Sequence, residues 1–298
     1  MSEINLLPPP IEPIDLPICR QKNISLNILR LDKIHPLVSG NKWYKLKEYL
    51  KDADAKNKKT IITFGGAYSN HIHATAAICE AYGFRSLGII RGERPAVLSP
   101  TLTDAQNWNM ELHFVSRADY KTKYIADDIV QSYPDYYIIN EGGYGEKGMI
   151  GAKEILANVD KTVYSHIIAA VGTGTTLAGL IAAKAPQQYI IGISVLKNNF
   201  GLGKDIQLLT GSDTAATILH DYHFGGYAKY TPELFSFMNE WYRQTHIPSD
   251  FVYTGKLFFA VQQLLQQNYF APNANILIVH SGGLQGNRSL PKGTLIFG

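Results

Sequence analysis

Residues 167–176 read Ile-Ile-Ala-Ala-Val-Gly-Thr-Gly-Thr-Thr, an apolar run that passes directly into a turn of glycine and threonine. Residues 177–185, which follow, are rich in Ala and Leu and have the pattern of a helix that packs on a sheet. A buried strand, a glycine turn and a helix form the repeating unit of parallel sheets covered by helices on both faces. This stretch therefore predicts an α/β fold.

The same unit recurs on both sides of this stretch. Further strands are expected at residues 24–31, 61–64, 87–90, 112–115, 136–139, 190–195 and 276–279. Further helices are expected at residues 41–56, 71–82, 98–109, 124–131, 149–157, 232–242 and 257–267. Strands that alternate with helices at this spacing predict parallel sheets rather than a sandwich or a helical bundle.

The composition excludes several classes of protein. The chain has 298 residues, enough for one large α/β domain or two domains that share a cleft, and 45% of them are hydrophobic, so the chain is not disordered. The chain has 28 Lys and Arg against 25 Asp and Glu, and a net charge of +3 is too small to indicate a nucleic-acid or membrane-surface partner. Cys19 and Cys79 have neither disulfide nor metal-ligand spacing and are expected to be buried thiols. Without a signal-peptide or membrane-span pattern, a cytoplasmic location is expected.

Ligands of open parallel sheets bind beyond the carboxyl ends of the strands, where the turn Gly172-Thr-Gly-Thr-Thr176 lies. Glycines let the backbone approach a phosphate, and the amides at the start of the helix point at it. The turn is not the dinucleotide fingerprint, because Leu177 stands where Gly or Ala is required, and it lacks the Gly-Lys-Ser/Thr of a P-loop. It favours a monophosphate, although a tight turn with a threonine cap would also explain it.

The turn Gly65-Gly-Ala-Tyr-Ser-Asn70 has the same layout after an earlier strand. Ser69 and Asn70 fall where the helix begins, so they could hold a carboxylate on backbone amides and bond a second ligand group. Ordinary helix capping explains the pair equally well. Two further turns, Gly225-Gly-Tyr-Ala-Lys-Tyr230 and Ser281-Gly-Gly-Leu-Gln-Gly286, carry similar residues.

Lys42 and Lys45 lie three residues apart and so share one face of the expected helix 41–56. Lysines usually cover solvated faces, but a lysine kept neutral by its surroundings can act as a Schiff-base nucleophile, and a neighbouring lysine can neutralise a phosphate. His71 and His73 have no Cys or acidic companion in this helical stretch, so no metal site is expected.

Five motifs occur together and in order: Ser39-Gly-Asn-Lys-Trp-Tyr-Lys-Leu-Lys47, Gly65-Gly-Ala-Tyr-Ser-Asn-His71, Gly172-Thr-Gly-Thr-Thr176, Val252-Tyr-Thr-Gly-Lys256 and His280-Ser-Gly-Gly283. On these motifs the chain resembles the 1-aminocyclopropane-1-carboxylate deaminase and D-cysteine desulfhydrase family, pyridoxal-phosphate enzymes built like the tryptophan synthase β-subunit. The resemblance spans residues 39–286. It implies two open, twisted, mostly parallel sheets wrapped by helices, with pyridoxal 5'-phosphate in the cleft between domains. Residues 1–53 and 141–298 would form the large domain, and residues 54–140 a small inserted one.

The resemblance also implies a role for each matching cofactor residue. Lys42 would form the Schiff base with the cofactor and later move the Cα proton of the substrate, while Lys45 would contact the phosphate. Asn70 would bond the phenolate oxygen of the cofactor, and Ser281 would lie at the cofactor. The phosphate itself would lie in the loop formed by Gly172, Thr173, Gly174, Thr175 and Thr176.

For the substrate, the resemblance implies that Ser69 holds its carboxylate and that Asn70 and His71 also belong to the substrate-binding site. Tyr253 would lie beside the ring and the substrate. A second active-site tyrosine is expected in the upstream turn, where spacing indicates Tyr227 and leaves Tyr230 as the alternative.

Two departures separate the branches of this family. The deaminases resemble one another in having Glu after the motif tyrosine and Leu before the Gly-Gly pair, whereas this chain has Thr254 and Ser281, as the desulfhydrases do. A carboxylate keeps the pyridine nitrogen protonated and strengthens the ring as an electron sink, and a hydroxyl does so less. Because opening a cyclopropane needs more such help than expelling a thiolate, the sequence favours elimination.

The resulting hypothesis is a D-cysteine desulfhydrase-like lyase that converts a small amino acid with a β leaving group to pyruvate, ammonia and hydrogen sulfide. The alternatives are a 1-aminocyclopropane-1-carboxylate deaminase, a racemase or lyase for another β-substituted residue, and a non-catalytic protein that binds a phosphorylated metabolite. The resemblance further implies a homodimer.

Overall fold

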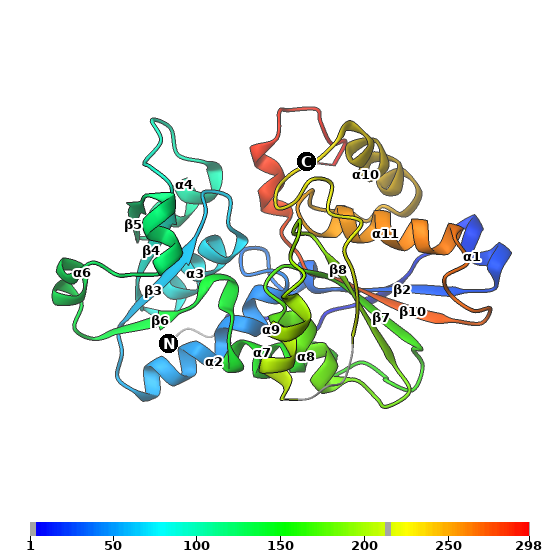
Figure 1. The fold of residues 1–298 in the computed structure, drawn as a ribbon, viewed down its shortest axis with the longest axis horizontal. Coiled ribbons are helices and arrows are strands. Elements are labelled where there is room, and N and C mark those ends of the chain that lie inside the picture. Colours follow the sequence, from blue (N-terminus) through cyan, green and yellow to red (C-terminus); the bar gives the residue numbers. More distant parts are fainter. Residues whose placement is uncertain (1–3, 212–215, 298) are drawn as a thin grey trace.

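In a computed structural model, which describes residues 4–211 and 216–297, two separate sheets form the framework of the molecule (Figure 1). The larger sheet has the strand order β1-β2-β10-β7-β8-β9 and is parallel except for β1 at its edge. Its strands are β1 (Ile11–Pro13), β2 (Ser25–Arg30), β7 (His166–Val171), β8 (Tyr189–Ser194), β9 (Thr217–Leu219) and β10 (Asn275–His280).

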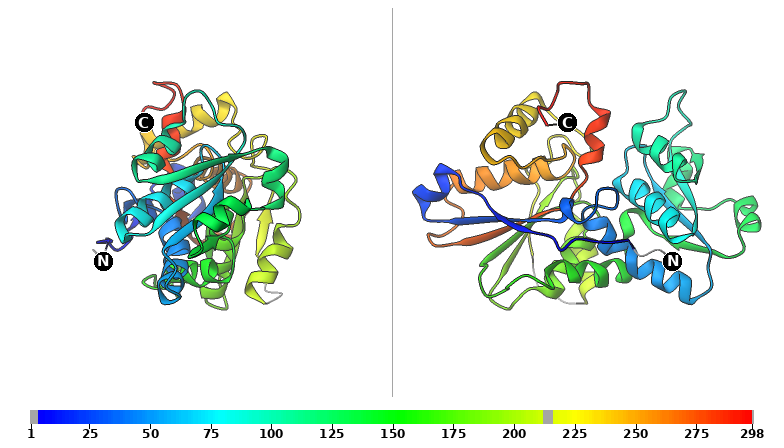
Figure 2. Two further views of the ribbon diagram at one scale, coloured as in Figure 1. Left: turned by 90° about the vertical axis from the view of Figure 1, so that its left-hand side faces the viewer. Right: turned by 180° about the vertical axis from the view of Figure 1, so that it is seen from behind.

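The smaller sheet is entirely parallel and has the order β5-β4-β3-β6. Its strands are β3 (Thr60–Gly65), β4 (Arg85–Arg91), β5 (Met110–Val115) and β6 (Tyr136–Ile139). The view from behind shows the same separation of the two sheets (Figure 2). The expected architecture of two mostly parallel sheets is therefore confirmed.

Helices cover both faces of each sheet because the strand residues are apolar on both sides. On the larger sheet, α1 (Pro17–Lys22), α10 (Pro232–Thr245) and α11 (Thr254–Gln266) pack on one face, and α7 (Glu146–Lys153), α8 (Thr175–Ala183) and α9 (Leu202–Thr210) pack on the other. On the smaller sheet, α3 (Asn70–Tyr82) and α4 (Pro100–Asn107) lie opposite α5 (Arg117–Thr122) and α6 (Asp127–Ser132).

Helix α2 (Asn41–Ala55) connects the two halves, since it packs against α7 on one side and α3 on the other. The chain thus enters the small sheet through α2 and leaves it after β6. The division into residues 1–53 with 141–298 and residues 54–140 would place one sheet in each domain, and we retain it as a proposal.

The expected strands and helices agree with the structure, with four kinds of difference. The edge strands β1 and β9 and the short helices α1 and α5 were not expected, and α6 begins three residues later than the predicted helix 124–131. Helix α9 was not expected either, because its flanking glycines, Gly201 and Gly211, obscure an amphipathic stretch that buries Leu202 and Ile206. Both cysteines are buried free thiols, as predicted. Within the described residues, no helix is both long and apolar enough to cross a membrane.

Candidate active site

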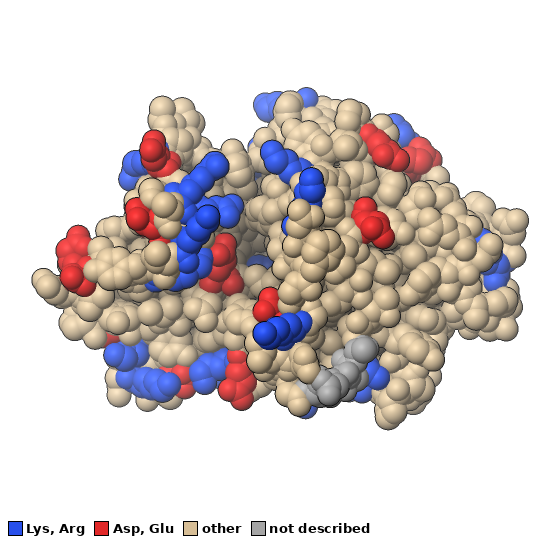
Figure 3. Space-filling view, viewed as in Figure 1, with Lys and Arg blue, Asp and Glu red and all other residues tan. Residues whose placement is uncertain are grey.

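A cavity of about 440 Å³ lies between the two sheets, beyond the carboxyl ends of β3 and β7. The space-filling view shows the corresponding hollow between the two halves of the molecule (Figure 3). Every site residue predicted from the sequence lines this cavity: Lys42, Lys45, Ser69, Asn70, His71, Gly172, Thr173, Gly174, Thr175, Thr176, Tyr227, Tyr253 and Ser281. The structure thus brings together residues from six distant segments, while their individual roles stay predictions.

The first turn of α2 presents Lys42 to the cavity. The Lys42 Nζ donates to Asn41 Oδ1 at 3.1 Å, and Asn41 Nδ2 donates to Thr176 Oγ1 at 2.9 Å. Asn41 therefore links the lysine to the threonine turn at the start of α8. Burial lowers the pKa of the Lys42 ammonium to about 8, and Asp250 opposes this shift only in part.

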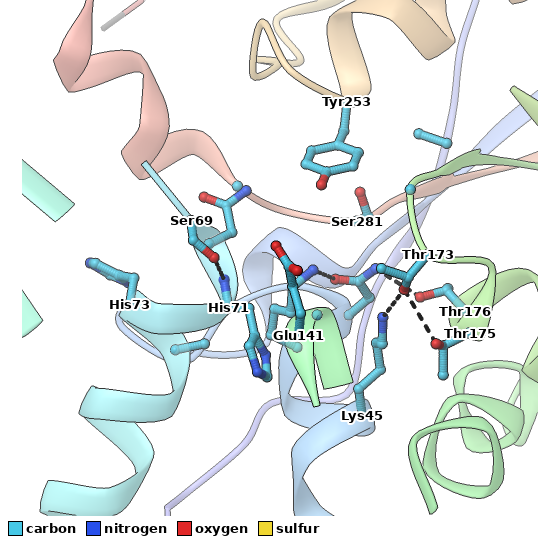
Figure 4. A pocket seen from close by; sticks show the side chains of 18 of the residues that line it. Lys45, Ser69, His71, His73, Glu141, Thr173, Thr175, Thr176, Tyr253 and Ser281 are labelled. Atoms are coloured by element: carbon cyan, nitrogen blue, oxygen red, sulfur yellow. Dashed lines mark hydrogen bonds between the residues drawn. The ribbon is translucent and has the colours of Figure 1, made fainter. Parts of the chain in front are cut away.

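Lys45, one turn further along α2, is 3% exposed and points at the same turn (Figure 4). Its Nζ lies 3.5 Å from Thr173 Oγ1, which in turn lies 3.3 Å from Thr175 Oγ1. Burial and the nearby Lys42 hold the pKa of Lys45 well below its usual value, and no carboxylate of the described residues lies within 4 Å of either ammonium. Two buried cations without an acidic partner, beside hydroxyls and the N-terminus of α8, fit a bound phosphate.

Ser69 caps helix α3. Its Oγ accepts hydrogen bonds from the backbone N–H of His71 at 3.2 Å and of Ile72 at 3.3 Å, so the capping role considered for this motif is correct for Ser69. Asn70 Oδ1 accepts a hydrogen bond from Gln285 Nε2 across the cleft. Both side chains still border the cavity, which leaves a ligand-binding role open to them.

His71 is 2% exposed, and its Nε2 lies 2.8 Å from Thr63 Oγ1. Its Nδ1 is buried with no partner in the described part of the chain. Burial, with the two lysines nearby, holds the pKa of His71 well below its usual value, so the ring is neutral. His73 points instead to Asp104, with Nε2 3.1 Å from Oδ2.

The structure distinguishes between the two tyrosines of the upstream turn. The rings of Tyr227 and Tyr253 meet edge to face, with centroids 6.2 Å apart, and Lys42 Nζ lies 5.8 Å from the Tyr253 centroid. Burial raises the pKa of Tyr227 to about 12 and that of Tyr253 well above its usual value, so both are phenols. Tyr230 is 48% exposed, packs on Phe235 and does not line the cavity.

Thr254 does not line the cavity, although its place in the family motif predicts a hydroxyl near the pyridine nitrogen of the cofactor. It is fully buried at the start of α11, and its Oγ1 donates to Asp250 Oδ1 at 2.7 Å. The interpretation of Thr254 as a hydroxyl at the pyridine nitrogen is therefore wrong, because Asp250 takes up that hydroxyl. Ser281 does line the cavity and is the hydroxyl that remains for this position.

Three charged residues that line the cavity were not predicted: Asp32, Arg91 and Glu141. Arg91 ends β4 and Glu141 follows β6 in the small sheet, whereas Asp32 follows β2 and pairs with Arg30. Glu141 begins a short 3₁₀ helix directly after β6, and its Oε2 accepts from Lys123 Nζ at 2.6 Å. The glycine pair after this carboxylate, at the carboxyl end of a predicted strand, was the available signal. Arg91 carried no such signal.

A buried lysine with a lowered pKa, linked through Asn41 to a turn that fits a phosphate, is typical of enzymes that bind a phosphorylated carbonyl cofactor on a lysine. Residues 17–282 match the family described as pyridoxal-phosphate dependent enzyme, and the chain belongs to that family. Its cofactor is therefore pyridoxal phosphate, and the composition of the cavity agrees with it.

Similar proteins extend over nearly the whole chain. The "Putative 1-aminocyclopropane-1-carboxylate deaminase" of Thermotoga maritima is 27% identical over 95% of this chain and 96% of its own. The D-cysteine desulfhydrase of Yersinia enterocolitica is 26% identical, covering 86% of each chain. A solved structure described as an ACC deaminase homologue superposes with a TM-score of 0.82, at 25% identity, over 96% of this chain and 92% of that one.

The lowered pKa of Lys42 predicts how cofactor capture depends on pH. Because the ammonium loses its proton near pH 8 rather than near 10.5, we expect the rate constant for capture of pyridoxal phosphate by the cofactor-free protein to rise with pH, to be half-maximal near pH 8 and to level off above it. The growth of visible absorbance after mixing measures this rate. A rate that keeps rising up to pH 10.5 would contradict the shift.

Proposed function

We propose that the protein is a pyridoxal-phosphate-dependent lyase that eliminates the β substituent of a small amino acid, with D-cysteine as the first substrate to test. The observation that carries this proposal is the position of Lys42, whose amine lies between the threonine turn and the Tyr253 ring and has its pKa lowered to about 8. An amine with such a pKa is neutral in a useful fraction near neutral pH, as a base must be.

When bound, pyridoxal phosphate supplies an aldehyde that condenses with amines and a ring that accepts electrons from the substrate Cα. Lys45, the hydroxyls of Thr173 and Thr175 and the amides of α8 would hold its phosphate. Lys42 would take the proton from the Cα atom. Tyr253, which stays a phenol at neutral pH, would bond or protonate a leaving group.

The products follow from the chemistry of a β leaving group. Removal of the Cα proton and departure of the thiolate break one C–H and one C–S bond, and water then releases the nitrogen. D-cysteine and one water thus give hydrogen sulfide, pyruvate and ammonia. Ser281 supports this branch, because a neutral hydroxyl polarises the ring less than a carboxylate and elimination requires less polarisation than cyclopropane opening.

A second candidate is 1-aminocyclopropane-1-carboxylate deamination, which is favoured by the printed name of the Thermotoga maritima relative. The two candidates separate when pure protein is given each substrate alone and sulfide, pyruvate and 2-oxobutanoate are measured. We expect sulfide and pyruvate in equal amounts from D-cysteine and little 2-oxobutanoate from the cyclopropane acid. Formation of 2-oxobutanoate alone would reverse the choice.

The proposal also includes a homodimer and a cytoplasmic location. The homodimer rests on the family resemblance. Sedimentation of the purified protein at several concentrations tests the dimer directly.

A further inference from the structure

Lys256 is a buried lysine that lines no part of the cavity and has no place in the chemistry above. It is 0% exposed and lies in the first turn of α11, three residues after Tyr253. Its Nζ donates to the backbone oxygen of His223 at 2.9 Å and to that of Gly226 at 2.7 Å. A fully buried ammonium requires such acceptors, so these two bonds fix where the turn lies relative to α11.

The turn that Lys256 holds has an unusual backbone. Phe224 and Ala228 have positive φ angles of 50° and 53°, which L residues rarely adopt, and Gly225 and Gly226 have φ angles of 92° and 119°. Such a conformation persists only where surrounding contacts impose it. The Gly226 carbonyl that Lys256 binds directly precedes Tyr227, so the lysine controls the position of that side chain.

A second buried charge holds the other tyrosine. Asp250, also 0% exposed, accepts hydrogen bonds on Oδ2 from the backbone N–H of Val252 and of Tyr253, both at 2.9 Å. Lys256 therefore supports the backbone next to Tyr227, and Asp250 supports the backbone of Tyr253. The rings of these two tyrosines meet at the cavity wall.

We propose that Lys256 is a positioning residue that holds Tyr227 against Tyr253 and thereby shapes the wall beside the cofactor ring. Its kinetic consequence rests on the proposed lyase function, whereas its effect on cofactor binding does not.

The test compares Lys256→Met with Lys184→Met. Lys184 Nζ also donates to two backbone oxygens, those of Ala185 at 3.4 Å and Pro186 at 3.3 Å, but it lines no part of the cavity. We measure the dissociation constant of pyridoxal phosphate by fluorescence titration, the visible spectrum of the bound cofactor, and kcat and KM for D-cysteine. Lys256→Met should weaken cofactor binding about tenfold and shift the visible band, and Lys184→Met should change binding by less than about twofold.

A double-mutant cycle with Tyr227→Ala, which removes the ring, separates positioning from general stability. If Lys256 acts through the Tyr227 ring, Lys256→Met should cost less than about twofold in cofactor affinity once Tyr227 is already Ala. An equal loss in both backgrounds would overturn the proposal. Should Lys256→Met fail to fold, Tyr227→Ala alone still decides, since unchanged affinity and spectrum would leave nothing for Lys256 to position. Failure of the lyase reaction in the wild-type protein would remove only the kinetic readout.

Discussion

Replacement of Lys42 by alanine is expected to lower kcat for sulfide release by at least about a thousandfold and to abolish the visible colour of the protein. Lys42 is the one residue that is proposed both to bind the cofactor covalently and to move the substrate proton, so both functions are lost together. Borohydride treatment followed by peptide mapping should place a pyridoxyl group on residue 42 of the wild-type protein and none on Lys42→Ala.

The matched control is Lys51→Ala. Lys51 lies on the same helix, but its side chain is 68% exposed and its Nζ pairs with Glu48, away from the cavity. It should retain full activity and colour. A yellow Lys42→Ala protein that still releases sulfide at the wild-type rate would refute the assignment of Lys42. A colourless wild-type protein would instead favour a non-catalytic binding protein.

Loss of activity in the Lys42 variant should not reflect unfolding. The pKa of Lys42 is about 8 in the folded protein against 10.5 for a free lysine, so folding disfavours its ammonium. This cost is fully present below pH 8 and disappears as the pH rises through 10.5. Without cofactor, a variant that lacks the ammonium should therefore be at least as stable as the wild type at neutral pH, as thermal unfolding would show.

The strands and helices that show a clear hydrophobic periodicity could be predicted from the sequence. The runs around residues 87–90 and 167–171 are apolar on both faces, and a parallel strand covered on both sides requires that pattern. The location of the site was equally accessible, because glycine turns at the carboxyl ends of such strands converge on one edge. The family resemblance then joined Lys42 and the Gly172–Thr176 turn, 130 residues apart, in one hypothesis.

The direction of individual side chains was not accessible in the same way. Tyr253 and Thr254 are neighbours, yet one faces the cavity and the other bonds Asp250, because α11 begins between them. A motif specifies which residues are near a site but not which of two neighbours points into it. Glu141 escaped prediction for a related reason, since a single carboxylate after a strand is common and gains meaning only from the cavity it borders.

Gly40→Ala is expected to lower the affinity for pyridoxal phosphate by at least about a hundredfold, although Gly40 itself carries no functional group. A Cβ at Gly40 would lie 2.1 Å from the Ser281 backbone oxygen and 2.9 Å from Gly282 Cα, distances that no Cβ tolerates. The same oxygen accepts the Asn41 N–H at 3.1 Å. The start of α2 must therefore move away from the Ser281 turn, and Lys42 moves with it.

Gly83→Ala provides a control for a glycine of positive φ where no space is lost. Gly83 has a φ of +72° and a ψ of 23°, and a Cβ there meets no atom within 4 Å. Gly83→Ala therefore incurs only the left-handed strain of about 1 to 2 kcal/mol in thermal or denaturant unfolding. Gly40, with a φ of 76° and a ψ of −162°, lies in a region that only glycine readily adopts, so Gly40→Ala should destabilise the fold more than Gly83→Ala. Only Gly40→Ala should also lose cofactor affinity in a fluorescence titration. Equal affinity in the two variants would show that the contact between Gly40 and the Ser281 turn does not position Lys42.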